Sequence, residues 1–237
     1  GDVYKRQPFI RAAQKYNPEL TFWTSPWCPP SWMKITGDYP VLSSKFNHMP
    51  EKMNYILYGN VNDKVDPDEM KLVGRRGDKF PRQLATTDYF IQDPRYLQAY
   101  ANYFCKFIDA YKEQGVNIDM VIYQNEAYSY TPYPGCAWTA EGTVRFNRDY
   151  LGPTLRQKHP EVKLYLGTFN TNRVDYVQKI ASDTKLQEYV SGMAFQWEGR
   201  ESLPVLRKEH PEWNYMCSES ECGRGSFDWG AGEHTFE

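Results

Sequence analysis

The stretch Met120-Val121-Ile122-Tyr123-Gln124-Asn125-Glu126 decides the fold that we predict for this chain. Its first four residues are apolar, β-branched or aromatic, which is the pattern of a short buried strand. Polar residues follow at once, so Glu126 lies just past the carboxyl end of that strand. Parallel α/β barrels place their active-site side chains at this end of their strands.

A second strand of this kind also runs into a glutamate. Residues Tyr215, Met216 and Cys217 precede Ser218 and Glu219. Because the carboxyl ends of parallel strands lie at one edge, Glu126 and Glu219 are predicted to converge on one cleft. Two facing carboxyl groups are what the hydrolysis of a glycosidic bond requires, one as acid and one as base or nucleophile.

Strands and helices alternate along the rest of the chain, which predicts a parallel α/β sheet in one domain over residues 1–237. The strands are expected near residues 20–24, 118–123, 163–168, 191–196 and 214–218. The helices are expected over residues 8–16, over 93–114, from residue 139 onward with an interruption at 152–153, over 174–189 and over 201–209. Residues 41–90 are polar and rich in turn formers, and we expect them to be an irregular insertion.

Composition excludes several classes of function. The 237 residues carry 28 basic and 30 acidic side chains, a net charge of −2, so neither a nucleic acid nor an anionic membrane is expected as a partner. No apolar run is long enough to span a bilayer. The five cysteines form no CxxC pair and the four histidines have no ligand spacing, so no metal and no cofactor are expected. A disulfide between Cys217 and Cys222 fits their spacing but cannot be deduced from it.

The chemistry assigns different roles to the two carboxyl groups. Glu126 suits the acid, because the adjacent Asn125 could hydrogen-bond the 2-hydroxyl of a sugar. Glu219 is favoured as nucleophile over Glu221 because it comes directly off its strand. Three tryptophans lie at or near strand ends, where each could either wall a sugar pocket or fill the core: Trp27, Trp32 and Trp197.

Five motifs in a fixed order give the chain a specific resemblance. They are Ser25–Lys34 (SPWCPPSWMK), Gln124-Asn125-Glu126, Tyr150–Leu155 (YLGPTL), Ala194-Phe195-Gln196-Trp197 and Ser218-Glu219. Over about residues 8–229 the sequence resembles glycoside hydrolase family 30, which includes glucosylceramidases. The resemblance implies an incomplete (β/α)₈ TIM barrel with strands three to seven present. Strands one, two and eight and a companion β-sandwich would be missing, and the chain alone is expected to have little or no activity.

The resemblance also implies functional residues. Glu126 matches the acid/base after the fourth strand, Glu219 the nucleophile after the seventh, and Asn125 the contact to the 2-hydroxyl. Substrate-binding residues are expected to be Trp27, Trp32, Gln196 and Trp197. Where glucosylceramidases have His-Trp-Tyr after strand six, this chain has Gln196-Trp197-Glu198. The tyrosine that supports the nucleophile is therefore absent there, and another group would have to take its role.

The leading hypothesis is a retaining β-glycosidase that needs no cofactor and acts on a β-linked glycoside or glycan. Glucosylceramide, β-1,6-glucan, xylan and β-fucosides are all substrates of such enzymes, and the sequence does not choose among them. The alternatives are a carbohydrate-binding protein without turnover, an inactive fragment of such a hydrolase, or another barrel hydrolase such as a cellulase. A secreted or periplasmic location is implied by the resemblance only, and the oligomeric state stays open.

Overall fold

A computed structural model describes residues 3–41, 88–127 and 133–219 of the chain. Within these ranges five parallel strands form one sheet in the order β1-β2-β3-β4-β5, so each strand pairs with its neighbour in the sequence. The strands are β1 (Trp23–Thr24), β2 (Met120–Ile122), β3 (Lys163–Phe169), β4 (Val190–Gln196) and β5 (Asn214–Glu219). Parallel neighbours need crossover connections, and helices supply most of them.

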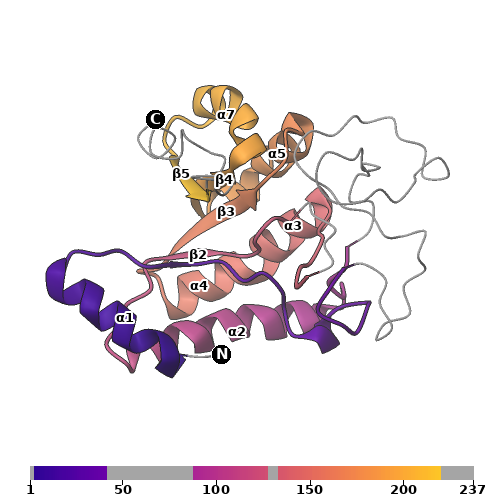
Figure 1. Ribbon diagram of the computed structural model, residues 1–237. Coiled ribbons are helices and arrows are strands. Elements are labelled where there is room, and N and C mark those ends of the chain that lie inside the picture. Colours follow the sequence, from indigo (N-terminus) through magenta and orange to yellow (C-terminus); the bar gives the residue numbers. More distant parts are fainter. Residues whose placement is uncertain (1–2, 42–87, 128–132, 220–237) are drawn as a thin grey trace, which may run out of the picture.

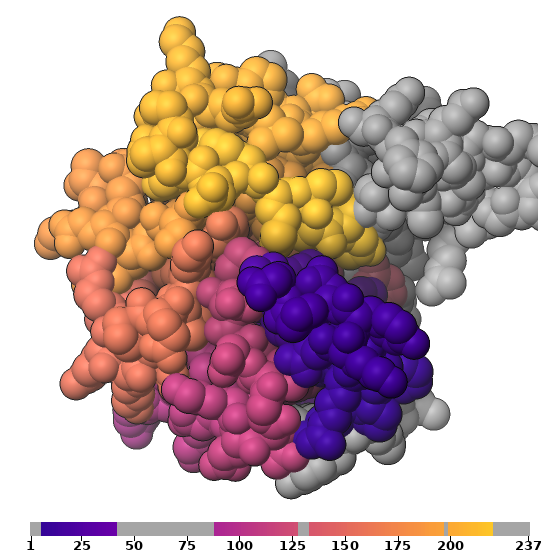
Figure 2. Space-filling view, turned by 90° about the vertical axis from the view of Figure 1, so that its left-hand side faces the viewer, coloured from indigo at the N-terminus to yellow at the C-terminus, as the bar shows by residue number. Residues whose placement is uncertain are grey.

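The α-helices are α1 (Val3–Tyr16), α2 (Pro94–Lys112), α3 (Ala140–Phe146), α4 (Gly152–Lys158), α5 (Val174–Ala181), α6 (Thr184–Gln187) and α7 (Leu203–Glu209). Shorter helical turns are η1 (Ser31–Met33), η4 (Asn147–Leu151) and η5 (Trp197–Ser202). Figure 1 shows α2 and α4 together below β2, and α7 above β4 and β5. In the turned view of Figure 2 the colours follow sequence order in an arc from α2 to β5, with the indigo N-terminal segment beside the magenta start of the arc, where β1 pairs with β2. This is the arrangement of an incomplete TIM barrel, as predicted.

The five predicted strands are present, but the first is much shorter than expected. Only Trp23 and Thr24 pair with β2, although residues 20–24 were predicted to be extended. The backbone N–H of Phe22 donates instead to the Asp119 carboxylate, at 2.6 Å between N and Oδ2. That side chain occupies the position of a ladder partner, so regular pairing begins one residue later.

The first helix also differs from its prediction. It begins at Val3 rather than at Pro8, which therefore lies inside the helix and leaves one internal hydrogen bond unmade. Two of its aromatic residues, Phe9 and Tyr16, are 79% and 86% exposed and do not pack against the core. Ile10 makes the helix's contact with the main core.

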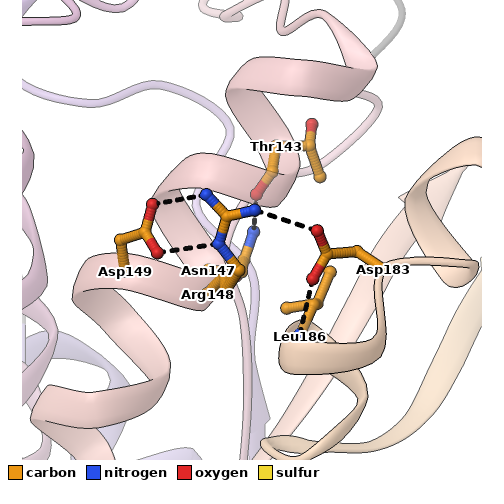
Figure 3. Close-up of polar contacts among 6 residues, drawn as sticks. All are labelled: Thr143, Asn147, Arg148, Asp149, Asp183 and Leu186. Atoms are coloured by element: carbon orange, nitrogen blue, oxygen red, sulfur yellow. Dashed lines mark hydrogen bonds and ion pairs between the residues drawn. The ribbon is translucent and has the colours of Figure 1, made fainter.

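Two predicted helix boundaries are corrected by the structure. The helix does not break at Gly152-Pro153, because the π-helical turn η4 joins α3 to α4 and the N–H of Gly152 reaches the carbonyl of Asn147. The predicted helix over 174–189 is split into α5 and α6 by Asp183, which caps α6 through its carboxylate (Figure 3). Arg148 of η4 donates to the same carboxylate at 2.9 Å, so the N-terminal cap of α6 is hydrogen-bonded to the turn between α3 and α4.

The sheet buries apolar side chains on both faces. The larger cluster lies between the sheet and the helices and includes Tyr89 and Phe90, the last residues of the predicted insertion. The smaller cluster lies on the opposite face, where Ile122, Tyr165 and Ala194 are buried. Residues 42–87, most of that insertion, lie outside the described residues. Among the helices that the structure describes, none has the length and apolarity to cross a membrane.

Candidate active site

The loop that follows β2 is fixed to the Pro- and Trp-rich loop that follows β1. Gln124 is fully buried, and its amide donates to the carbonyl oxygen of Trp27 at 2.7 Å. The N–H of Asn125 donates to the carbonyl oxygen of Pro26 at 2.8 Å. The indole N–H of Trp138 donates to Oε1 of Gln124 at 3.4 Å. These contacts hold Asn125 and Glu126 at the carboxyl edge of the sheet.

Glu126 has an unusual backbone conformation at this edge. Its φ is 48°, in the left-handed region that residues other than glycine rarely adopt. Its N–H donates to the carbonyl oxygen of Thr168 on β3 at 3.0 Å, which holds the backbone in this position. The Asn170 amide donates to Oε1 of Glu126 at 2.7 Å. Glu126 is therefore held at two points, at its backbone N–H by Thr168 of β3 and at its carboxyl group by Asn170, the residue after β3.

The surroundings of Glu126 favour its protonated form. Burial raises its pKa, and the negative charge of Glu219 raises it further, while the hydrogen bond from Asn170 opposes both effects. A carboxyl group that stays protonated toward neutral pH can act as a general acid.

Glu219 is the last residue of β5, at the same edge of the sheet. A register shift after Phe195 pairs Gln196 with Glu219 across β4 and β5. Gln196 donates from Nε2 to Oε2 of Glu219 at 3.0 Å. Burial raises the pKa of Glu219, whose side chain is nevertheless partly exposed.

A single hydrogen-bonded network connects Glu219 to the loop of Glu126. Besides Glu219, Nε2 of Gln196 lies 2.8 Å from Oδ1 of Asn125 and 2.8 Å from Oγ1 of Thr168. The Thr168 hydroxyl donates to the same Oδ1 at 2.9 Å. The structure thus brings together four of the seven predicted site residues: Asn125, Glu126, Gln196 and Glu219.

The predicted tryptophans are placed differently. Trp27 and Trp32 are 50% and 59% exposed, so neither fills the core, and each contacts a tyrosine ring with 5.7 Å between ring centroids. Trp197 begins η5 directly after Gln196. The side chains of Trp197 and Glu198, and the whole of Glu221, lie outside the described residues.

Sequence reasoning missed two polar residues of this site, Thr168 and Asn170. Both lie at the end of β3, and Thr168 is fully buried. The rule that singled out Glu126 could have found Asn170, which lies two residues past the predicted strand over 163–168. Thr168 lies inside that predicted strand, so its position gave no such signal.

The cysteines and histidines form no further centre in the part of the chain that the structure describes. Cys217 is a free, exposed thiol, and Cys222 lies beyond the described ranges, so a disulfide between them stays untested. No group of three or more His, Cys, Asp or Glu side chains among the described residues could hold a metal ion.

Comparison with known proteins decides the family. Residues 1–46 and 89–235 match the glycosyl hydrolase family 30 TIM-barrel domain. The chain belongs to this family. The match leaves out residues 47–88, which lie within the predicted insertion.

The curated relatives of the chain carry two kinds of name, glucosylceramidase and endo-1,6-β-D-glucanase. The chain is 26% identical to putative glucosylceramidase 1 of Caenorhabditis elegans, over 96% of this chain and 37% of that protein. It is 28% identical to lysosomal acid glucosylceramidase of Mus musculus, over 83% of this chain and 31% of that protein. An endo-1,6-β-D-glucanase of Aspergillus fumigatus is 26% identical, over 78% of this chain and 31% of that protein. The chain therefore spans about a third of the length of the curated relatives that it matches.

Solved structures support the fold. The structure of SrfJ from Salmonella typhimurium superposes with a TM-score of 0.64 at 20% identity, over 95% of this chain and 42% of that one. At this identity the likeness concerns the fold, and it agrees with a family 30 barrel.

Proposed function

We propose that the protein containing this chain hydrolyses β-linked glycosides with retention of configuration, with Glu126 as acid/base and Glu219 as nucleophile. The observation that carries the proposal is the Gln196 amide, which lies within hydrogen-bond distance of both Glu219 and Asn125. It connects the carboxyl group of Glu219 to Asn125, the residue that precedes Glu126. Retaining enzymes need such a pair about 5–5.5 Å apart.

In the first step a carboxylate oxygen of Glu219 forms a bond to the anomeric carbon. The bond from that carbon to the leaving oxygen breaks, and the proton of Glu126 passes to the leaving oxygen. The raised pKa of Glu126 supports this role, because the group must carry its proton when substrate binds.

In the second step the oxygen of water forms a bond to the anomeric carbon of the glycosyl ester, Glu126 takes up the proton of that water, and the bond from the anomeric carbon to Glu219 breaks and restores the Glu219 carboxylate. The ester carries no charge, so the effect of Glu219 that raised the pKa of Glu126 is removed. The hydrogen bond from Asn170 remains and favours the carboxylate. Both effects favour the deprotonated form of Glu126, which is the form that accepts the proton of water in this step.

The sugar is best accounted for as a β-glucosyl group. Asn125 accepts two hydrogen bonds at Oδ1, and none of the described residues accepts one from its Nδ2, which leaves that donor for the 2-hydroxyl. The relatives are named for glucosylceramide and for β-1,6-glucan. In both substrates the glucose is linked to the oxygen of a primary alcohol. We therefore propose β-glucosides of primary alcohols as the substrate class.

Azide rescue in the full-length protein tests the two assignments separately. In Glu219→Ala, azide fills the space of the nucleophile and attacks once, so the expected product is the α-glycosyl azide. In Glu126→Ala, azide intercepts the glycosyl ester after one inversion, so the expected product is the β-glycosyl azide. Without azide, Glu126→Ala should lose about 10²- to 10⁴-fold in activity on a poor leaving group.

Covalent trapping distinguishes the alternatives. A 2-fluoro β-glucoside should label Glu219, identified by peptide mass spectrometry after digestion. A label on Glu221 would show that the nucleophile is misassigned. Sugar binding with no label and no azide product would indicate a carbohydrate-binding protein instead.

A further inference from the structure

Gln196 is placed as part of the protein's own network rather than as a surface for substrate. Its side chain is 1% exposed. Its Nε2 lies within 3.0 Å of Asn125, Thr168 and Glu219. A residue so enclosed acts on a substrate only through the groups that it holds.

Counting hydrogens shows how the network is shared. The amide nitrogen of Gln196 has two hydrogens but three acceptors within reach. The Thr168 hydroxyl donates to Oδ1 of Asn125, which leaves lone pairs on Thr168 to accept from Gln196. Gln196 can therefore give one hydrogen to Glu219 and its other to the pair formed by Asn125 and Thr168.

The orientation of the Gln196 amide follows from the same contacts. Its Oε1 is buried and has no hydrogen-bond partner among the described residues. Turning the amide over would give this oxygen a hydrogen bond from Thr168 at most, and would set it against the oxygens of Asn125 and Glu219. The amide therefore points its nitrogen at the Glu219 carboxylate, and its oxygen is left without a hydrogen bond among the described residues.

We propose that Gln196 is a positioning residue that couples the nucleophile to the 2-hydroxyl contact. Its amide holds Oε2 of Glu219, so Oε1, to which no described residue donates, is the oxygen that bonds to the anomeric carbon. Its second hydrogen helps to hold Oδ1 of Asn125, which turns Nδ2 of Asn125 toward the sugar. This inference rests on the proposed glycosidase function.

The hydrogen bonds of Gln196 change in strength as the reaction proceeds. As Oε1 bonds to the anomeric carbon, the leaving group departs with the proton of Glu126, and Oε2 becomes an ester carbonyl. A neutral carbonyl is a weaker acceptor than a carboxylate. The amide of Gln196 then bonds more strongly to Asn125 and Thr168, while Asn125 contacts the 2-hydroxyl of the bound glycosyl group.

Two substitutions of Gln196 in the full-length protein, to Met and to Glu, test this role. Gln196→Met keeps the length of the side chain but removes the hydrogen bonds, and we expect kcat/KM for a β-glucoside to fall about 10- to 100-fold. The fall should be smaller for the matched 2-deoxy substrate, because that sugar lacks the group which Asn125 contacts. Gln187→Met, a partly buried glutamine on α6 that donates to one backbone carbonyl, is the control and should change neither value.

Gln196→Glu provides a second readout, which does not depend on the first variant folding. At neutral pH the introduced carboxylate faces Glu219 and Asn125 without a hydrogen to donate, so activity should fall further than in Gln196→Met. As the pH is lowered the introduced group gains a proton that it can donate. Activity relative to the parent should therefore recover toward acid pH.

Several outcomes would overturn the inference while leaving the proposed function intact. One is an equal loss of activity in Gln196→Met on the 2-hydroxy and the 2-deoxy substrate. Another is a Gln196→Glu variant whose activity relative to the parent does not depend on pH. In both cases Glu219→Ala still forms the α-glycosyl azide. If Glu219→Ala forms no glycosyl azide, the proposed function fails, and the role of Gln196 fails with it.

Discussion

Asn170 is the residue whose removal most directly tests the protonation of the proposed acid. Its amide hydrogen bond to Glu126 favours the charged carboxylate, so Asn170→Ala should raise the pKa of Glu126 above its present, already raised value. The acid must be protonated to work. The alkaline limb of the kcat/KM profile should therefore move to higher pH, as measured with a β-glucoside over a range of buffers.

Asn214→Ala is a matched control for this prediction. Asn214 is an exposed amide at the opposite end of β5, where its side chain contacts the carbonyl oxygen of Ser191. Its removal should leave the alkaline limb in place. A limb that moves to lower pH in Asn170→Ala would contradict the role given to this amide.

At the residue scale, the sequence predicts the ends of strands better than the contacts made there. The rule of a polar residue past a buried strand found Asn125, Glu126 and Glu219, all of which lie at the carboxyl edge. It does not reveal that Asn170 turns toward Glu126, because that contact depends on how β2 and β3 are packed. The resemblance implied a substrate contact for Gln196, and only the packed sheet shows that its side chain is enclosed and bonded to Asn125 and Glu219.

At the element scale, the register of β4 and β5 decides whether the network forms. Gly192 pairs with Asn214 at the start of these strands, and a Cβ at Gly192 would lie 2.2 Å from the backbone oxygen of Asn214. Gly192→Ala should therefore push β5 away and weaken the bond between Gln196 and Glu219. We expect a loss of about 1–3 kcal/mol in the free energy of unfolding and a lower kcat.

Urea unfolding and steady-state kinetics would measure the two effects. Ser191→Ala changes the neighbouring, only partly buried side chain of β4 and serves as control. If Gly192→Ala were as stable and as active as Ser191→Ala, β5 would be free to move at this point and the register would not control the site.

Elements were predicted where one local signal dominated and missed where a distant side chain intervened. The apolar runs of β2 to β5 and the proline-initiated, aspartate-capped helix α2 appear as expected. The first strand is shortened because Asp119, far along the chain, takes the N–H of Phe22. The π-turn that carries the chain past Pro153 has no simple sequence signature, and so a break was expected there.

At the scale of the whole molecule, the alternation of strands and helices was sufficient to predict the architecture. Every strand pairs in parallel with the next one along the chain, so the order of the sheet could be inferred directly from the sequence. The two faces of the sheet were harder to predict, because short parallel strands that are buried on both sides show no alternation of apolar and polar residues. Successive residues of β2 show the result, since Val121 belongs to the helix-side cluster and Ile122 to the opposite one.

The cluster on the opposite face should matter to stability more than its size suggests. Ile122 is fully buried there, in one cluster with Tyr165 and Ala194 against which the partly buried Met120 and Met216 pack. Because few neighbours could move in to fill a cavity, Ile122→Ala should cost about 2–5 kcal/mol in the free energy of unfolding. Ile122→Val removes one methylene from the same place and should cost about 0.5–1.5 kcal/mol. Urea unfolding of the two variants would measure the difference, and equal, small losses would show that this face of the sheet adds little to the stability of the fold.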